Sequence, residues 1–210
     1  MDEEAYPAGV EDSYLDGKPI VKVAFDQPVV DWAQVIAESV LPYHRTDFSR
    51  SGEEEIRNAT IGWLGQVAFY YYLERARWEE LVKTIPIGRY DDQDYVYKGH
   101  HLDVKSSGIA KTPRLLVTET DFLARQDDIY VLAWVRLDLN EVWILGWARK
   151  SEVASAAIDR KIRKPAYAIP FKELHEPKEA LKLPFKNADT SNHAESGQLT
   201  LIHQTKTGDR

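Results

Sequence analysis

The sequence predicts an α/β (α+β) fold built on a mixed central β-sheet of four to five strands that is flanked by helices. One observation behind this prediction is a long stretch in which apolar residues recur at helical spacing. The other is the series of short strand-like runs that follows it, separated by turn formers and by a second, shorter helical pattern. With 210 residues, of which 43% are hydrophobic, the chain can form one domain with a sizeable core.

The N-terminal part is expected to contain a loose arm, one strand and one helix. Residues 1–19 are acidic and rich in turn formers, which predicts the arm. Residues 20–25 (IVKVAF) have the composition of a strand. Asp31 can cap a helix that Pro42 ends, because proline removes a backbone donor that a helix needs.

The longest helix is expected to begin after Ser51, which can cap it, with three glutamates in the positive first turn. Its apolar positions repeat every three to four residues, so one face of this helix is predicted to be buried in the core. The residues of that face are Ile56, Thr60, Trp63, Leu64, Val67, Ala68, Tyr70 and Tyr71.

Five strand-like runs follow, at residues 82–87, 94–97, 102–106, 129–135 and 141–147. The last two are expected to pair as a hairpin across Asp138-Leu139-Asn140. A short helix that Ser151 caps and that extends through Ile158 comes next, then an edge-like segment at residues 167–169. Residues 20–185 are therefore predicted to form a single domain, and residues 186–210 a polar C-terminal tail.

The composition excludes several kinds of site. The chain has no cysteine, which excludes disulfides and thiolate metal sites and suits a reducing compartment. No run approaches the ~18 apolar residues of a membrane helix, and the acidic start is unlike a signal peptide, so a cytoplasmic protein without a membrane partner is expected. The net charge of −7 argues against a nonspecific nucleic-acid coat, but not against a carboxylate site whose bound cations reverse the local field.

The most informative segment is YDDQDYVYKGHHLDVKSSG, at residues 90–108. Lys98-Gly99 can form a two-residue turn, because glycine readily adopts positive φ. With this turn, Asp94 lies directly opposite Asp103 on the neighbouring strand. Strand alternation then predicts one face with Asp94, Val96, His101, Asp103 and Lys105, and a core face with Tyr95, Tyr97, Leu102 and Val104.

The expected acid pair suggests metal-dependent chemistry. Two carboxylates about 5 Å apart repel each other, and a hard divalent cation between them removes the repulsion. Lys105, on the same face, can stabilise charge that builds on a phosphate under attack. We therefore predict a Mg²⁺- or Mn²⁺-dependent site that cleaves phosphodiester bonds. Two alternatives remain open at this stage: Asp91 or Asp92 replaces Asp94 in a shifted register, or the acids are simply exposed on an unrelated α+β domain.

The D/E-x-K triplet alone is a weak signal, because the sequence contains four copies. They begin at Asp16, Asp103, Asp159 and Glu176. The copy at Asp103 differs from the others because it lies in a predicted strand whose hairpin partner carries a second acid at the matching position.

The segment DYVYKGHHLDVKSSG resembles the hairpin of the PD-(D/E)XK nuclease superfamily, and GWLGQVAFYYYL (residues 62–73) resembles that family's G-x-x-G-E-x-A helix. The resemblance covers about residues 50–147 and implies a restriction-endonuclease-like core and a Mg²⁺-dependent endonuclease acting on DNA. It implies that Asp94 and Asp103 bind the metal and that Lys105 is the catalytic lysine. Gln93 replaces the family proline. Gln66 replaces the helix acid, so it can bind a metal through its carbonyl oxygen but brings no charge.

Several further residues are candidates for the same site. Glu55, three turns before Gln66 on the same helix face, is a substitute for the missing acid, although a solvated glutamate is the plainer interpretation. Contacts to the phosphate backbone are expected from Ser106, Ser107, Lys111 and Arg114, with a solvated loop as the alternative.

The leading functional hypothesis is a Mg²⁺- or Mn²⁺-dependent endodeoxyribonuclease, and a homodimer would suit double-strand cutting. Gln66 and the acidic net charge motivate the alternative, a catalytically weak or inactive nuclease-fold module that binds nucleic acid or serves in assembly.

Overall fold

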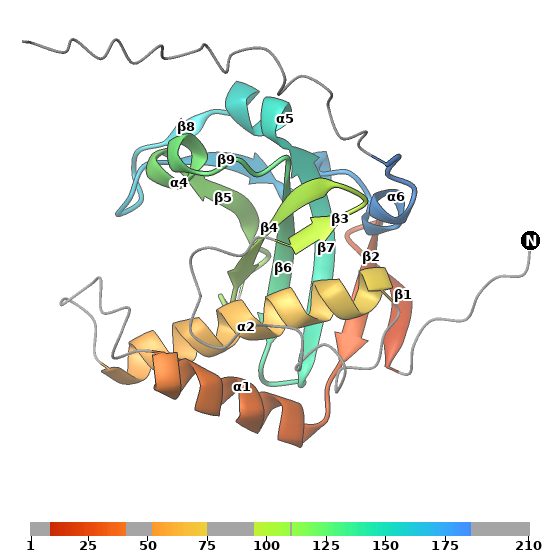
Figure 1. The fold of residues 1–210 in the computed structure, drawn as a ribbon, viewed down its shortest axis with the longest axis vertical. Coiled ribbons are helices and arrows are strands. Elements are labelled where there is room, and N and C mark those ends of the chain that lie inside the picture. The colour runs from red at the N-terminus through yellow and green to blue at the C-terminus, as the bar shows by residue number, and fades with distance from the viewer. Residues whose placement is uncertain (1–8, 41–51, 75–94, 110, 186–210) are drawn as a thin grey trace, which may run out of the picture.

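The computed structural model describes residues 9–40, 52–74, 95–109 and 111–185 of the chain (Figure 1). The described residues form a mixed α/β fold, as the sequence predicts, with a six-stranded sheet, a three-stranded sheet, five α-helices and one 3-10 turn. The main sheet is larger than the expected four to five strands, and the second sheet was not expected. The predicted strand at residues 82–87 and the predicted tail at residues 186–210 lie outside the described residues.

The six strands of the main sheet stand in the order β1-β2-β7-β6-β4-β3. The sheet is mixed because β4 and β6 run parallel while all other neighbours run antiparallel. The hairpin expected from the last two strand-like runs is confirmed as β6 and β7. The strands are β1 (Val10–Leu15), β2 (Lys18–Ala24), β3 (Tyr95–Tyr97), β4 (His100–Ser107), β6 (Ile129–Arg136) and β7 (Glu141–Arg149).

Strand β1 corrects the expectation of a loose arm over residues 1–19. It pairs with β2 along its whole length and forms one edge of the main sheet. Asp16 and Gly17, with φ values of 48° and 79°, make the two-residue turn between the strands. The acidic residues that suggested an arm, Glu11 and Asp12, are exposed on this edge strand, where charge is well tolerated.

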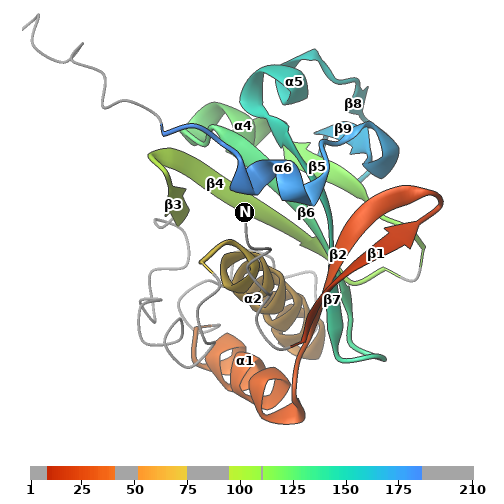
Figure 2. The ribbon, with the colours of Figure 1, turned by 90° about the vertical axis from the view of Figure 1, so that its right-hand side faces the viewer.

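Helices α1 (Gln27–Val40) and α2 (Gly52–Glu74) pack side by side and cover one face of the main sheet (Figure 2). The predicted apolar face of α2 is confirmed at Thr60, Trp63, Leu64, Val67, Ala68 and Tyr71, which are buried. Helix α1 begins four residues before its expected cap at Asp31. Pro28 permits this early start, because proline fits the first turn of a helix, where backbone N–H groups have no partner within the helix.

The opposite face of the main sheet carries the smaller sheet, whose strands stand in the order β5-β9-β8. Its segment at residues 167–169 is not the expected edge, because β9 pairs with a strand on each side. The expected helix begins at Lys150, one residue before its predicted cap at Ser151, and ends at Ser155 rather than at Ile158. Ile158 belongs to β8 and pairs with Tyr167 of β9. The elements of this layer are β5 (Arg114–Thr118), α4 (Glu119–Ala124), α5 (Lys150–Ser155), β8 (Ile158–Asp159) and β9 (Ala166–Pro170), followed by η2 (Phe171–Glu173) and α6 (Pro177–Leu181).

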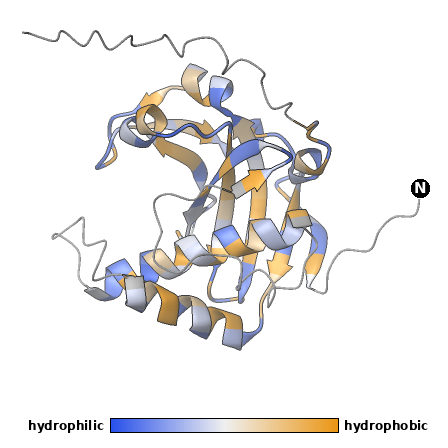
Figure 3. Cartoon of the chain, in the orientation of Figure 1, coloured by the Kyte–Doolittle hydropathy of each residue, from blue (hydrophilic) through white to orange (hydrophobic). Residues whose placement is uncertain are grey.

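The central strands β6 and β7 are hydrophobic over most of their length and separate two core clusters (Figure 3). Ile129 and Val131 pack toward α1 and α2, while Tyr130 and Leu132 pack toward the smaller sheet. Side chains that alternate along the neighbouring strand β4 are therefore divided between the same two layers. None of the described helices is long and apolar enough to cross a membrane.

Candidate active site

The hairpin of β3 and β4 has the register that the sequence predicts. Val96 pairs with His101, and the two-residue turn consists of Lys98 and Gly99. Their φ values of 50° and 82° are those of a type I′ turn, whose twist matches that of the paired strands. Local turn chemistry therefore fixes which residues of β4 lie on which face.

Strand β4 divides its side chains as expected. Leu102 and Val104 are buried in the core cluster beneath α2. Asp103 and Lys105 consequently point to the other face of the sheet, toward the layer that contains the smaller sheet. Asp94 lies outside the described residues, so its place opposite Asp103 stays a prediction.

Asp103 is a nearly buried carboxylate with two cationic partners. Its side chain is only 6% exposed, and its Oδ2 lies 2.7 Å from Lys105 Nζ and 3.5 Å from Arg125 Nη1. Burying a charged group is costly unless opposite charges and hydrogen bonds compensate it. The ammonium of Lys105 is shared, since Asp121 Oδ2 lies 3.4 Å from the same nitrogen. Two carboxylates and two cations thus form one connected network.

Helix α2 approaches β4 very closely at Gly65. A Cβ atom at this position would lie 2.0 Å from Ser106 Oγ, 3.0 Å from Ser106 Cβ and 3.2 Å from Ala133 Cβ, so only glycine fits. Ser106 Oγ is 3.4 Å from the carbonyl oxygen of Gly62, one turn earlier on the helix. This close packing holds Gln66, the next residue, beside β4, where it lines the same cavity as Asp103.

Helix α4 supplies the network residues Asp121 and Arg125. Thr118 caps the helix, its Oγ1 accepting the backbone N–H of Asp121 at 3.0 Å. The ammonium of Lys150 donates a hydrogen bond to the carbonyl oxygen of Arg125 and lies over the ring of Phe122, 5.1 Å from the ring centroid. The backbone at Arg125 is therefore bonded to the first residue of α5.

These side chains meet in a cavity of about 830 Å³ between α2, β4, β5 and α4. Gln66, Asp103, Lys105, Ser106, Ser107 and Arg114, all predicted from sequence as site residues, line it, whereas Lys111 is exposed and does not. Arg114 forms an ion pair with Asp159. The pKa of Asp159 is held below its usual value by a hydrogen bond from the backbone N–H of Lys161 and by Arg114.

Three polar lining residues, Asn58, Asp121 and Arg125, were not identified from the sequence. Asp121 lies in α4 and Arg125 directly follows it. The expected order of elements includes a short helix between the hairpin and the last two strands, but the sequence assigned no residues to it. The pattern Thr118-x-x-Asp121 is a helix-start signal of the capping-box type and could have indicated α4. No comparable local signal marks Asn58, which reaches the cavity because α2 crosses β4.

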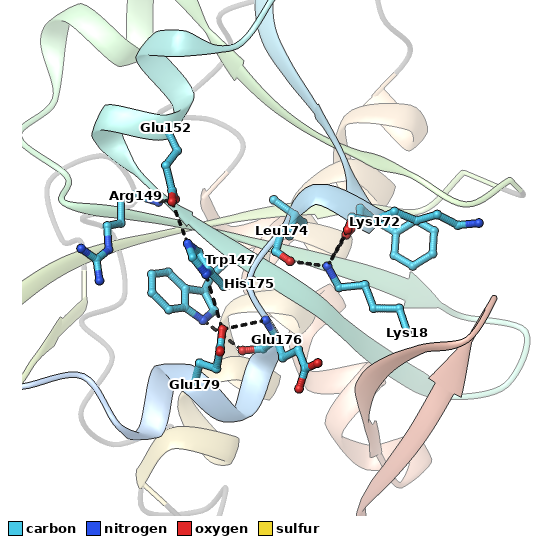
Figure 4. A network of polar contacts seen from close by, with 10 residues as sticks. Lys18, Trp147, Arg149, Glu152, Lys172, Leu174, His175, Glu176 and Glu179 are labelled. Atoms are coloured by element: carbon cyan, nitrogen blue, oxygen red, sulfur yellow. Dashed lines mark hydrogen bonds and ion pairs between the residues drawn. The ribbon is translucent and has the colours of Figure 1, made fainter.

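A second polar network, centred on Lys18 and His175, lies away from this cavity (Figure 4). The ammonium of Lys18 donates to the carbonyl oxygens of Phe171 at 2.8 Å and Lys172 at 3.2 Å, and to that of Leu174. Burial lowers the pKa of Lys18, while Glu176 and Glu179 act in the opposite direction. Since its donors bind main-chain carbonyls, Lys18 holds the segment around η2 in place.

His175 in the same network joins three elements. Its Nε2 lies 2.8 Å from Glu152 Oε1 of α5, its Nδ1 3.4 Å from Glu179 Oε2 of α6, and its ring stacks on Trp147 of β7 with centroids 4.4 Å apart (Figure 4). Both ring nitrogens face carboxylates within the protein. The network is therefore a structural junction, and the cavity around Asp103 is the better candidate for chemistry.

No family model, curated protein or solved structure matches this chain. Within the described residues, no three His, Cys, Asp or Glu side chains are grouped so that they could hold a metal ion by themselves.

Proposed function

We propose that the chain is a metal-dependent endonuclease that hydrolyses phosphodiester bonds in DNA at the cavity around Asp103 and Lys105. The observation that carries the proposal is the buried carboxylate of Asp103, which lies on the wall of this polar cavity with the ammonium of Lys105 2.7 Å away on the same strand face. Gln66 reaches the same cavity from α2, at the position of the family's helix acid. Residues from both segments that carry the resemblance thus line one cavity.

The donor atoms suit a hard divalent cation. Mg²⁺ prefers oxygen ligands and is commonly held by one or two carboxylates, with waters and substrate phosphate completing its coordination. Asp103 and Gln66 offer such oxygens in the cavity, and Asp94, outside the described residues, would add a second carboxylate. Bound there, Mg²⁺ or Mn²⁺ would supply a water of lowered pKa and a Lewis acid for the scissile phosphate.

Lys105 is assigned the stabilisation of charge on the phosphate during hydrolysis. Its ammonium is held between Asp103 and Asp121, at 2.7 Å and 3.4 Å, and therefore has little freedom to leave the cavity. A fixed positive charge in a partly desolvated site stabilises a developing anion more than a mobile one in water does. Ser107 and Arg114 line the cavity, and we assign to them contacts with the flanking phosphates.

The test is a cleavage assay with purified protein and Mg²⁺ or Mn²⁺ on supercoiled plasmid, linear duplex, single-stranded DNA and RNA. Lys105→Ala is expected to lower the cleavage rate by about 10²-fold or more, as removal of a transition-state donor usually does. Lys178→Ala is the matched control, because Lys178 forms an ion pair with Asp12 at the same distance of 2.7 Å but outside the cavity. We expect this control to cut at the parent rate.

Calorimetric titration with Mn²⁺ separates the nuclease from the alternative of a binding module. Metal binding that Asp103→Ala abolishes supports the proposal. If the parent protein binds no Mn²⁺ and cuts none of the four substrates, the nuclease proposal fails. Binding to nucleic acid without cleavage would then identify the nuclease-fold module, for which Gln66 in place of an acid is the motivating observation.

A further inference from the structure

Arg125 is a cavity residue that the proposed chemistry does not yet use. It is the C-cap residue of α4, its side chain is 25% exposed, and its Nη1 lies 3.5 Å from Asp103 Oδ2. Lys105 Nζ contacts the same carboxylate oxygen at 2.7 Å. One oxygen of the expected metal ligand is therefore bound by two cationic side chains that come from different elements.

The backbone of Arg125 is fixed, so its side chain has a restricted reach. Its N–H donates to the carbonyl oxygen of Asp121 at 3.0 Å, and its own carbonyl accepts from Lys150. Phe122 packs on Tyr167 of β9 with ring centroids 4.8 Å apart, which holds α4 on the smaller sheet. The guanidinium of Arg125 can therefore move away from Asp103 only by rotation about its own side-chain bonds, and it remains within reach of the cavity.

The contact with Asp103 cannot persist unchanged if a divalent cation binds that carboxylate. Two positive groups close to a third repel it, and the repulsion is strong where water is partly excluded. Lys105 and Arg125 therefore compete with the metal for Asp103. A phosphate group in the cavity removes this competition, because it offers both cations an anionic partner.

We propose that Arg125 binds the phosphate backbone of the DNA substrate and, in the free protein, occupies Asp103 in place of the metal, so that metal and DNA bind cooperatively. This inference rests on the proposed nuclease function. Guanidinium groups suit the role, because they form two parallel hydrogen bonds with a phosphate, and such charge-assisted bonds are stronger than neutral ones. DNA draws Arg125 away from Asp103, and the carboxylate becomes available to the cation.

The test uses the full chain and two binding measurements that do not depend on cleavage. Mn²⁺ titration of the free protein is expected to show at least about fivefold tighter binding to Arg125→Ala than to the parent, because one competing charge has been removed. Duplex DNA binding in Ca²⁺ is expected to weaken about tenfold in the same variant. The slope of log DNA affinity against log salt concentration should also become shallower by about one unit, as expected for the loss of one phosphate contact.

Two further variants make the result specific. Arg125→Lys keeps the charge and should retain the salt slope of the parent, while its DNA affinity falls below that of the parent because a lysine cannot form the paired bonds. Arg136→Ala is the matched control, since Arg136 also pairs with a carboxylate, Asp138 at 2.8 Å, but lies at the other end of β6. Circular dichroism spectra verify that each variant is folded.

The possible results distinguish this inference from the proposed function. Tighter Mn²⁺ binding together with a smaller salt slope in Arg125→Ala, and neither change in Arg136→Ala, supports the inference. A parent that binds metal and cuts DNA while Arg125→Ala matches it in both binding measurements would overturn the inference and leave the nuclease proposal intact. A parent that neither binds Mn²⁺ nor cuts overturns both.

Discussion

The close approach of α2 to β4 leads to a quantitative prediction at Gly65. Replacing it by alanine would place Cβ 2.0 Å from Ser106 Oγ, 3.0 Å from Ser106 Cβ and 3.2 Å from Ala133 Cβ. The hydroxyl can rotate away, but the two Cβ atoms belong to β4 and β6 and can move only with their strands. Overpacking of this kind costs typically about 1–3 kcal/mol and sometimes more, and alanine recovers up to about 1 kcal/mol of helix propensity.

We therefore expect Gly65→Ala to lower the free energy of unfolding by about 2 kcal/mol. The matched control is Gly52→Ala on the same helix, where a Cβ would meet no atom within 4 Å and the stability should stay within about 0.5 kcal/mol of the parent. Urea unfolding, followed by the circular dichroism of the helices, measures both. In the proposed nuclease, the added Cβ would also move Gln66 away from β4, so cleavage by the folded fraction of Gly65→Ala should fall.

A double-mutant cycle tests whether Ser106 is the cause. Ser106→Gly removes both Ser106 atoms from the clash and leaves only the 3.2 Å contact with Ala133. Gly65→Ala should consequently cost less in the Ser106→Gly background than in the parent, with a coupling energy of about 1 kcal/mol. Equal stability of Gly65→Ala and the parent, or an equal cost of the substitution in both backgrounds, would refute the packing argument.

Two further predictions concern the network around Lys18 and His175 (Figure 4). Lys18→Met should lower the free energy of unfolding by about 2 kcal/mol in thermal melts, because the main-chain carbonyls of Phe171, Lys172 and Leu174 lose their hydrogen-bond donor. A stability equal to that of the parent would contradict this role of Lys18. Burial opposes the ionisation of Glu152, but hydrogen bonds from the Arg149 N–H and from His175 outweigh it and hold the pKa of Glu152 below its usual value. The ionised carboxylate therefore stabilises the fold above the usual glutamate pKa, and this contribution is lost as the pH falls through the lowered pKa. Glu152→Gln should thus lower the free energy of unfolding by less than about 1 kcal/mol at pH 6, since the side chain is partly exposed. In urea titrations, the difference in stability between the variant and the parent should shrink toward pH 3. A difference that grows on acidification would contradict this prediction.

The sequence was most informative where structure depends on neighbouring residues. The register of the β3–β4 hairpin follows from Lys98-Gly99 alone, because a two-residue type I′ turn leaves only one pairing of the flanking strands. The same turn therefore predicts the burial of Leu102 and the placement of Asp103 on the opposite face. In α2, helical periodicity identified the buried face for the same local reason.

The smaller sheet could not be anticipated in this way. Strand β5 (Arg114–Thr118) is only five residues long, and its partner β9 (Ala166–Pro170) follows some fifty residues later in the chain. Its pairing is thus a tertiary interaction that no local pattern encodes, and the interpretation of residues 167–169 as an edge failed for this reason. Since α4 begins where β5 ends, Asp121 and Arg125 were missed together with the strand.

Under the proposed function, the polar lining of the cavity would explain how an acidic chain attracts DNA. Of the described residues that line it, Lys105, Arg114 and Arg125 are cationic, and Asp103 and Asp121 are anionic, although the whole chain has a net charge of −7. Among the described lining residues, cations thus outnumber anions by one, and Gln66 keeps this balance because it adds no negative charge. An acid at this position would favour the metal in the free protein and remove the local attraction for phosphate. In the proposed nuclease, the neutral Gln66 and the two cations on Asp103 would therefore act in the same direction, and both would favour a substrate phosphate that arrives before, or together with, the metal.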